Sequence, residues 1–501
     1  MFITYYKKNE KLYAALCESK RDGKKVNKTM TSLGRVIDKD KGIFKSRERG
    51  YFTYSLATQT YGKVDPAFSA PTTRGKLKLL QDFGDTFFLD KFMEKEKILD
   101  CINAIGYGNN DTLKALICYY IVSNSANYHA KDWYDFNYAS ILYPNANLIS
   151  QRISECLEAI GDEYSYRSFF NSYIKLFENV AKETNAAIDS TGLPNSIHFP
   201  LTAISNHNGE INNEVRLIYV LHLKTSLPIY FRYCPGNVID ASTLVRTLAE
   251  LKAMNVNVKF TVLDAGYSDL TNLDELFKEK ISFLVRVKEN TNLYKNILNE
   301  HKSTLQCKEN FVIYNGRGVY VKCIRTEIVN DNTGYVYLCL DPNKQNSEMT
   351  RLAKKAEKSK LKSSKIYELA NDSGYFMLAS TRRIANTKVL PNYYARQEIE
   401  QVFDIGKNYA DLLPLSVEKE ATFRGHLLLT FIATAVLRKI QQKLLTTSFN
   451  TNSLFINLRN HKCKVYENQI VTQELFKKVN DIYKIFNIDC PVTIPVTGIS
   501  L

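Results

Sequence analysis

The chain of 501 residues carries a formal net charge of +15 and has a sequence pI of about 9.1, which favours a polyanionic partner. Its most apolar run, Leu427–Leu437, is far shorter than the roughly 20 residues of a membrane span, so we expect a buried core helix and no membrane partner. Ten scattered cysteines without zinc-site spacing, and no visible signal peptide, lead us to expect reduced thiols in a cytoplasmic protein.

The first two segments of the chain differ in their hydrophobic period. Residues 1–68 alternate polar and apolar positions, and Asp22-Gly23 is a hairpin turn signal, so we expect a small β-rich N-terminal module. Residues 72–182 have helical periodicity instead, which is clearest over Thr112–Val122 and Tyr166–Ala181. The sequence thus predicts a β module followed by a helical region.

One run in the helical region has a pattern typical of DNA-binding helices. Residues 147–161 are similar to the second half of a helix-turn-helix, and such a helix would present Ser150, Gln151 and Arg152 to a major groove. An ordinary amphipathic helix in a bundle has the same pattern. Both interpretations stay open, and Arg152 is the candidate DNA contact of this region.

Residues 183–290 contain two aspartates that adjoin strand-like runs. Asp189 ends a short apolar run and is followed by the turn-forming residues 190–192, whereas Asp264 follows a β-branched and aromatic run and precedes a glycine turn. The predicted order is three strands, a helix, a strand, a helix and a strand. The elements other than the two aspartate-bearing strands are expected over Glu214–Leu223, Leu227–Tyr233, Ala241–Met254, Leu270–Lys280 and Ser282–Val287.

Residues 291–380 combine strand-like runs with a strongly basic segment. The runs cover 310–314, 319–324 and 334–340, and the segment Arg351–Lys365 has seven cations and one anion. The basic segment would bind a DNA backbone with a steep dependence on salt, or it would be a solvated helix. Both interpretations stay open.

The segment 381–445 contains four polar residues that a single α-helix would gather on one ridge. At about 100° per residue, Tyr393, Arg396, Glu400 and Lys407 fall within an arc of about 60°. Two cations, a carboxylate and a phenol would suit a phosphodiester, although Arg396 and Glu400 are equally an ordinary i,i+4 pair on a solvated face. The apolar face beside this ridge consists of Ala395, Ile399, Val402 and Phe403.

The spacing Tyr-x2-Arg-x3-Glu-x6-Lys of these residues resembles the signature of bacterial insertion-sequence transposases of the DDE type. It is similar to the branch that excises its element through hairpin ends, insertion sequence family four and its relatives. This resemblance implies an α/β fold with a ribonuclease H-like core, in which Asp189, Asp264 and Glu400 are the catalytic and metal-binding carboxylates. The long separation of Asp264 and Glu400 agrees with the β-rich insertion of that branch.

The resemblance also implies a cofactor and partners. Carboxylates are the ligands that hard divalent cations prefer, so Mg2+ or Mn2+ is expected, with two ions about 3.5–4 Å apart. Tyr393, Arg396 and Lys407 would grip the end of the element during hairpin formation and resolution. The implied partners are double-stranded DNA at the terminal inverted repeats, target DNA, and a second copy of the chain in a synaptic homodimer, at the nucleoid of a bacterial cytoplasm.

We therefore predict a transposase that cleaves DNA at the ends of its own element and transfers the strands. The alternatives are a catalytically inactive, transposase-derived DNA-binding protein or repressor, and a ribonuclease H-like nuclease without strand transfer. We expect the three carboxylates to lie together, and Arg396 and Lys407 to face the same open groove. No role is predicted for residues 446–501. The other acidic candidates, expected to be cap, turn or surface residues, are Asp240, Asp269, Glu398 and Asp404, of which Asp404 is the rival to Glu400.

Overall fold

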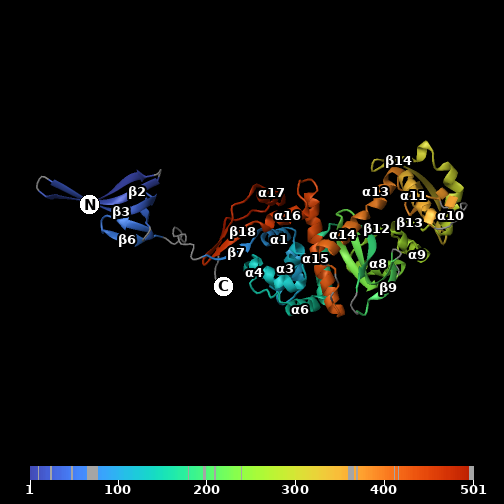
Figure 1. Cartoon of the computed structure of the whole chain (residues 1–501), viewed down its shortest axis with the longest axis horizontal. Coiled ribbons are helices and arrows are strands. Elements are labelled where there is room, and N and C mark those ends of the chain that lie inside the picture. Colours follow the sequence, from blue (N-terminus) through green and yellow to red (C-terminus); the bar gives the residue numbers. More distant parts are fainter. Residues whose placement is uncertain are drawn as a thin grey trace. The chain divides into compact units, whose positions relative to one another are not determined.

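The chain folds into two units, and Figure 1 shows their elements in the colours of the sequence. The smaller unit consists of Met1–Leu80, Cys463–Glu474 and Pro491–Leu501, and the larger unit of Gln81–Lys462 and Leu475–Cys490. The computed structural model describes all residues except 9–10, 23–24, 47–48, 65–76, 124, 179, 196–198, 208–209, 239, 359–365, 368–369, 411, 414, 416 and 496–501.

The smaller unit begins with the expected β-rich module, an antiparallel sheet in the order β1-β2-β3-β4-β5-β6. Ala14, Leu33, Phe44 and Phe52 form its buried core. Asp22 pairs with Lys25, as the expected hairpin requires, while Gly23 lies outside the described residues. The strands are β1 (Phe2–Lys8), β2 (Lys11–Asp22), β3 (Lys25–Asp38), β4 (Ile43–Ser46), β5 (Gly50–Ser55) and β6 (Thr60–Lys63).

A second sheet, in the order β20-β19-β18-β7, gives the C-terminal tail a structure that its sequence does not suggest. Its antiparallel pairs join strands of the tail to one another, and the Thr472 hydroxyl donates to the Pro491 carbonyl oxygen at 2.8 Å. The strands are β7 (Leu77–Asp82), β18 (Lys462–Tyr466), β19 (Gln469–Thr472) and β20 (Thr493–Pro495).

The helical region of the larger unit is built on the long helix α15 (Glu420–Leu444), which in Figure 1 stands between the other helices and the core strands. The run Leu427–Leu437 is buried, as predicted. Among the described residues, no helix is long and apolar enough to cross a membrane. The other helices are α1 (Gly84–Lys95), α2 (Ile98–Ala104), α3 (Asn110–Val122), α4 (Ala130–Phe136), α5 (Ala139–Leu142), α6 (Ser150–Ile160), α7 (Glu163–Tyr173), α16 (Thr451–Arg459) and α17 (Lys477–Phe486).

Helices α6 and α15 approach each other so closely that only glycine fits at two points. A Cβ atom at Gly425 would lie 1.9 Å from the carbonyl oxygen of Leu157, and one at Gly161 would lie 1.8 Å from that of Ala421. Cβ atoms in real structures essentially never approach another heavy atom below 3.0 Å. The two glycines therefore fix the position of α6 against the bundle.

One large sheet runs through the rest of the larger unit, in the order β11-β10-β8-β12-β13-β17-β16-β15-β14, with β9 paired to β10. β8 pairs antiparallel with β10 and parallel with β12, which in turn pairs parallel with β13. The order of elements expected for 183–290 is confirmed, with β9 as an additional strand. These elements are β8 (Thr184–Pro194), β9 (Ala203–His207), β10 (Glu210–His222), β11 (Leu227–Pro235), α8 (Leu244–Ala253), β12 (Val258–Leu263), α9 (Leu270–Lys278) and β13 (Ser282–Arg286).

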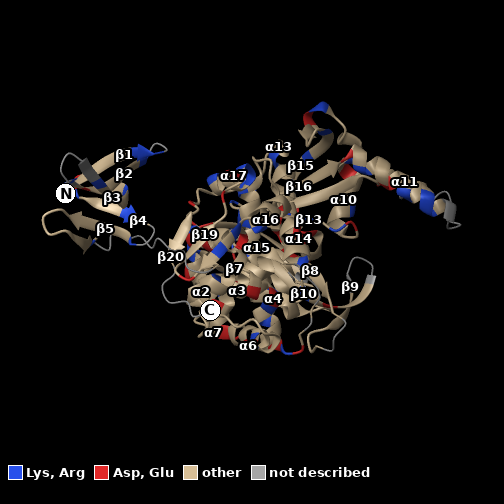
Figure 2. Ribbon diagram, turned by 60° about the vertical axis from the view of Figure 1, so that its left-hand side comes forward, with Lys and Arg blue, Asp and Glu red and all other residues tan. Residues whose placement is uncertain are grey.

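The expected β-rich insertion extends this same sheet, because β17 returns antiparallel beside β13. Figure 2 shows α11 reaching outward with Lys and Arg along its length, and Arg351, Lys354 and Lys355 are exposed. Residues 359–365 of the basic segment lie outside the described residues. The elements are α10 (Asn292–His301), β14 (Phe311–Tyr314), β15 (Arg317–Val329), β16 (Asn332–Leu340), α11 (Pro342–Lys358) and β17 (Tyr375–Ser380).

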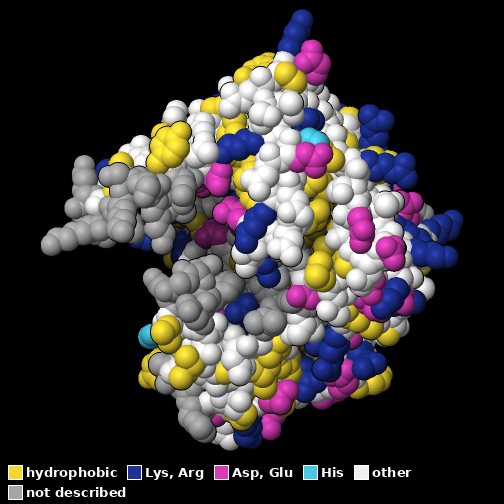
Figure 3. Space-filling view, turned by 90° about the vertical axis from the view of Figure 1, so that its right-hand side faces the viewer, with side chains coloured by type: hydrophobic (Ala, Val, Ile, Leu, Met, Phe, Trp, Pro, Cys, Tyr) yellow, Lys and Arg dark blue, Asp and Glu magenta, His cyan; other side chains and the backbone are white. Residues whose placement is uncertain are grey.

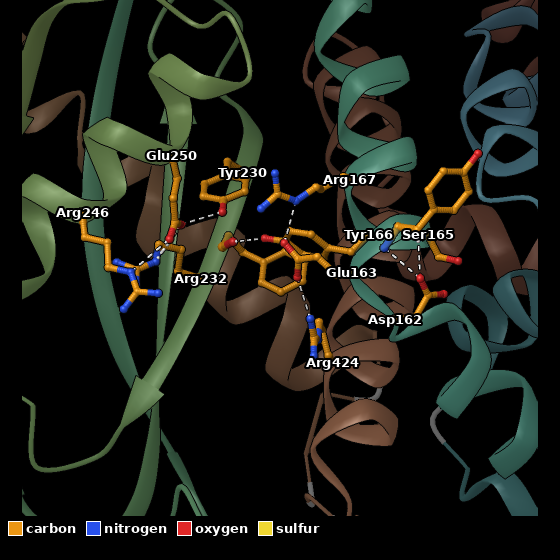
Figure 4. A network of polar contacts seen from close by, with 12 residues as sticks. Asp162, Glu163, Ser165, Tyr166, Arg167, Tyr230, Arg232, Arg246, Glu250 and Arg424 are labelled. Atoms are coloured by element: carbon orange, nitrogen blue, oxygen red, sulfur yellow. Dashed lines mark hydrogen bonds and ion pairs between the residues drawn. The ribbon is translucent and has the colours of Figure 1, made fainter.

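A network of ion pairs joins α7, α8 and α15 around the edge strand β11 (Figure 4). The Glu250 carboxylate accepts from Tyr230 Oη at 2.8 Å and pairs with Arg232 at 2.9 Å and Arg246 at 3.3 Å. Glu163 pairs with Arg167 and Arg424, both at 2.7 Å. All four arginines thus pair with one of two glutamates, and these ion pairs tie the elements around this cleft of about 510 Å³ together.

Glu250 tests the strength of this network. We expect Glu250→Ala to lower the free energy of unfolding by about 2–3 kcal/mol, because it leaves the Arg232 charge, which is 11% exposed, without its partner. Arg246→Ala is the control, since Arg246 is 76% exposed and its loss should cost about 0.5 kcal/mol or less. Urea unfolding measures the free energy of unfolding of both variants. Equal decreases in the two variants would show that the ion pair between Glu250 and Arg232 does not stabilise the fold.

Candidate active site

Two neighbouring parallel strands bring Asp189 and Asp264 together. β8 and β12 are paired up to Ile188 and Leu263. Asp189 is the next residue of β8, and Asp264 directly follows the end of β12. Ile188 and Leu263 are buried, so the core anchors the backbone from which both carboxylates project. The side chain of Asp264 stays 40% exposed and that of Asp189 16% exposed.

Asp189 lies inside a strand, which corrects the prediction that a turn follows it. β8 continues to Pro194, because residues 190–192 pair with residues 216–218 of β10. The sequence Ser-Thr-Gly favours a turn locally, but pairing with a distant strand outweighs this preference.

Glu400 comes from α14 (Gln397–Tyr409), whose apolar side packs on the same sheet. Ile399, Val402 and Phe403 are buried, as their spacing predicts. The Phe403 ring stacks on that of Tyr219 in β10, with centroids 5.1 Å apart. This packing fixes the helix above β8, while the Glu400 side chain is 58% exposed.

The predicted ridge of four polar residues is not one continuous helix. Tyr393 belongs to α13 (Asn386–Tyr394), and the chain turns at Ala395 and Arg396 before α14 begins. Backbone hydrogen bonds at the junction span three residues, as from Arg396 N to Tyr393 O (3.3 Å) and from Ile399 N to Arg396 O (2.8 Å). With about three residues per turn, the angles of a uniform α-helix do not hold there.

The guanidinium of Arg396 lies among all three carboxylates. Its Nη1 atom is 3.0 Å from Asp189 Oδ2 and 3.9 Å from Glu400 Oε1, and its Nη2 atom is 3.2 Å from Asp264 Oδ1. The predicted convergence of Asp189, Asp264 and Glu400 is therefore found, with a cation of the protein itself at its centre.

Tyr393 and Lys407 flank this cluster, but neither stands free in an open groove. Tyr393 is 2% exposed, and its hydroxyl donates to Asp264 Oδ1 at 3.2 Å. The Lys407 ammonium donates to Thr191 Oγ1 at 2.7 Å and to the Gly192 carbonyl oxygen at 3.0 Å. Arg396 thus faces the carboxylates, whereas Lys407 is held by acceptors of β8. That the two cations face one open groove stays a prediction.

The pKa values of Tyr393, Lys407 and Arg396 are shifted from their ordinary values. Burial raises the pKa of Tyr393 to about 12, so the phenol keeps its proton and remains a donor. It lowers the pKa of Lys407, against the opposing effect of the Glu214 charge. Burial also disfavours the charge of Arg396, but Tyr393, Asp264 and Asp189 outweigh it and raise the pKa of the guanidinium.

Comparison with known proteins shows the family of the chain. The family profile described as the transposase DDE domain matches residues 182–436, just over half of the chain, and includes the three carboxylates. The chain belongs to the DDE transposase domain family. No curated protein is detectably similar in sequence. The solved piggyBac transposase synaptic complex with hairpin DNA is similar over 75% of this chain and 79% of that one, at 10% identity and a TM-score of 0.40, which is too low to support a conclusion.

The donor set of this transposase-family site fits a divalent metal, although a guanidinium stands within it. Among the described residues, no group of three or more His, Cys, Asp or Glu side chains is arranged to hold a metal ion. Three carboxylates around one cation are nevertheless hard oxygen donors with excess negative charge. Asp189, Asp264 and Glu400 therefore have the donor chemistry that a divalent metal requires.

The competing acidic residues lie outside the cluster. Asp404 accepts from the Asn408 amide at 2.6 Å, and Glu398 forms an ion pair with Arg438 of α15. Asp269 caps α9 by accepting from the Thr271 backbone N–H at 3.0 Å, and Asp240 begins a short 3-10 helix. Of the acidic residues of α14, Glu400 is the one that meets the aspartates.

Arg152 lies on the exposed side of α6, where it forms an ion pair with Glu155. Ser150 and Gln151 are exposed beside it. The opposite side of the helix is buried in the bundle, through Ile153, Cys156, Leu157 and Ile160. The amphipathic pattern thus reflects packing, and the exposed residues stay candidates for a DNA contact.

A buried ion pair behind Lys407 has no counterpart in the sequence predictions. Glu214 and Arg216 of β10 are each 5% exposed, and Oε1 and Nη2 are 3.6 Å apart. The Glu214 carboxylate lies against Gly192, where a Cβ atom would come within 2.0 Å of Oε2. Two opposite charges at i and i+2 of a strand share one face of the sheet, which is the signal that marks them.

Proposed function

We propose that this protein is a transposase that cuts and joins DNA at the ends of its own insertion sequence, by a cut-and-paste route through hairpin ends. The observation that carries the proposal is the meeting of Asp189, Asp264 and Glu400 around one cationic centre. Adjacent parallel strands hold the first two, and a helix packed on the same sheet holds the third. The sheet and the packed helix therefore hold the three carboxylates in place, and the side chain of Glu400 is exposed to solvent.

The strand order supports a ribonuclease H-like core. In β11-β10-β8-β12-β13, the first three strands are antiparallel and the last three are parallel. Asp189 lies on β8, which is the first strand of this sheet along the chain. Asp264 follows β12, the strand that pairs parallel with β8, and Glu400 comes from the later helix α14. This arrangement agrees with the roles proposed for the three carboxylates.

The site residues divide the work between metal binding and substrate binding. Asp189, Asp264 and Glu400 would hold two Mg2+ or Mn2+ ions, which when bound activate the attacking oxygen and stabilise the departing one. Arg396 can grip two oxygens of a phosphate with its planar fork, and Lys407 adds a point charge. Tyr393 is buried, so its hydroxyl orients Asp264 in this conformation.

Two features favour the hairpin-forming branch. The Tyr-Arg-Glu-Lys spacing resembles that of the branch, and the strands β14 to β17 occupy the interval between Asp264 and Glu400. The branch also leads us to propose a homodimer that holds two element ends. Tyr393 is 2% exposed, so a contact with DNA requires this side chain to leave its buried position.

The charge of the chain suits double-stranded DNA at the terminal inverted repeats and at the target. Figure 3 shows Lys and Arg side chains over the viewed face, with Asp and Glu among them. The basic helix α11 and the exposed end of α6 with Arg152 offer further backbone contacts. Backbone contacts give affinity without sequence preference, so recognition of the repeats needs groove contacts as well.

The test uses the full chain and a duplex that carries the DNA flanking its gene. With Mg2+ or Mn2+ we expect nicks at the element boundary, hairpin ends and transfer into a plasmid, each lost with EDTA and with a duplex of shuffled sequence. End binding without any cleavage would favour the repressor. Cleavage without transfer would favour the nuclease, and either result would overturn the proposal.

Lys407 tests the proposed phosphate contact. We expect Lys407→Ala to weaken end binding and to reduce the slope of log affinity against log salt by about 0.9, the value for one lost phosphate contact. Lys388→Ala removes an exposed charge from α13 and is the control. Fluorescence anisotropy over a salt series measures the slope. A lower melting temperature with an unchanged slope would show that Lys407 serves only to hold β8.

A further inference from the structure

The guanidinium of Arg396 lies among the three carboxylates that would bind the metal. We propose that Arg396 is the resident counter-cation of Asp189, Asp264 and Glu400 in the DNA-free protein, and that a DNA phosphate must draw it away before divalent metal binds fully. This inference rests on the proposed function. It adds that metal binding and DNA-end binding at this site are coupled.

The geometry shows one cation serving three anions. The guanidinium contacts the two aspartates at 3.0 and 3.2 Å and lies 3.9 Å from the glutamate. Its side chain is 14% exposed, so water screens these contacts only in part. Among the described residues, the buried Arg396 Nε atom has no hydrogen-bond partner, so the ion pairs with the carboxylates are made by the two terminal nitrogens. The contacts of Arg396 are thus directed at the carboxylates that a metal requires.

A metal ion and the guanidinium cannot share this position. Asp189 Oδ2 accepts an N–H group of Arg396, and Asp264 Oδ1 lies 3.2 Å from Nη2 and accepts the Tyr393 hydroxyl. A carboxylate oxygen that coordinates a divalent ion must instead direct its lone pairs at the ion. A second cation in the same half-buried site would also be repelled by the first. Metal binding to the free protein must therefore include the cost of displacing Arg396.

A DNA phosphate is suited to remove this obstacle. The planar fork that fits a carboxylate fits a phosphate equally well, so Arg396 can exchange one anion for the other without losing its hydrogen bonds. The exposed Glu400 side chain marks the side from which the phosphate can approach. By linkage, DNA that removes Arg396 tightens metal binding, and the metal tightens DNA binding by the same factor.

Mn2+ binding, followed by the electron paramagnetic resonance of the free ion, tests the coupling without any turnover. The proteins are the wild-type chain, Arg396→Ala, and Lys388→Ala as a matched loss of one positive charge on α13. In the absence of DNA we expect Arg396→Ala to bind Mn2+ at least about 10-fold more tightly than the wild type, and Lys388→Ala to match the wild type. An element-end duplex, corrected for the Mn2+ it binds alone, should tighten binding to the wild type but not to Arg396→Ala.

The outcomes separate this inference from the function on which it rests. Equal Mn2+ affinity of wild type and Arg396→Ala without DNA overturns the coupling but leaves the transposase proposal intact. No Mn2+ binding by any of the proteins, with or without the duplex, overturns the metal site itself. The double variant Asp189→Asn/Arg396→Ala must lose the tight binding, or the ion binds elsewhere. If Arg396→Ala does not fold, Arg396→Lys replaces it. A lysine can pair with fewer of the carboxylates, so Arg396→Lys should also bind Mn2+ more tightly than the wild type, but by a smaller factor.

Discussion

Replacing any one of Asp189, Asp264 and Glu400 by its amide, as in Asp189→Asn, Asp264→Asn or Glu400→Gln, is expected to reduce strand cleavage by at least about 10³-fold, which is about 4 kcal/mol in the barrier. An amide keeps the shape of the side chain but removes a negative charge and a metal-binding oxygen. Without divalent metal, end binding should stay within a few-fold of the wild type, because Arg396 and Lys407 remain. Cleavage of an end-labelled duplex and anisotropy on the same preparations measure both effects.

Two other acidic residues of α14 provide the controls for this experiment. Asp404 is hydrogen-bonded to Asn408, and Glu398 is paired with Arg438, so neither contacts Arg396. Asp404→Asn and Glu398→Gln should therefore cleave at a rate near that of the wild type. If Asp404→Asn abolishes cleavage and Glu400→Gln does not, the helix contributes a different carboxylate from the one proposed.

The second large effect is expected at Gly425, where α15 meets α6. Gly425→Ala should destabilise the larger unit by at least about 3 kcal/mol, because the new Cβ would lie 1.9 Å from the Leu157 carbonyl oxygen and the two helix backbones would have to separate. This loss exceeds the gain of about 1 kcal/mol that alanine brings to a helix interior. Thermal and urea unfolding of the variant measure the difference.

Gly108 provides the matched control for this glycine. A Cβ atom there meets nothing within 4 Å, so Gly108→Ala should change the free energy of unfolding by less than about 0.5 kcal/mol. If Gly425→Ala is no less stable than Gly108→Ala, the close approach of α6 and α15 does not exist in solution. The same result would remove the structural reason for the position of Arg152.

Local patterns in the sequence predicted many of the elements but not their pairing. The alternation of residues 1–68 and the runs around Asp264 predicted strands, and the spacing of Ile399, Val402 and Phe403 predicted the buried side of α14. These features depend on residues within one or two turns of each other. The periodicity of a helix or strand is therefore readable without knowledge of the rest of the chain.

The errors arose where distant parts of the chain decide the outcome. Asp189 was expected at a strand end, yet β10 supplies partners that extend β8 beyond it. Tyr393 was placed on one helix with Arg396, but the chain tightens at the junction, where both side chains bind aspartates of the sheet. The role of Arg396 as a partner of three carboxylates also required the tertiary structure, since locally only its i,i+4 relation to Glu400 is visible.

The distance along the chain between Asp189 and Arg396, 207 residues, has a consequence for the order in which the protein is made. A ribosome completes β8 and β12 long before it reaches α14, so the nascent chain carries two aspartates with neither their glutamate nor their counter-cation. Contacts of such long range also form late in folding, because closing the loop costs entropy before the contact is gained. The site is consequently among the last parts to assemble, and an incomplete chain that ends before α14 lacks two of the residues proposed to act in DNA cleavage.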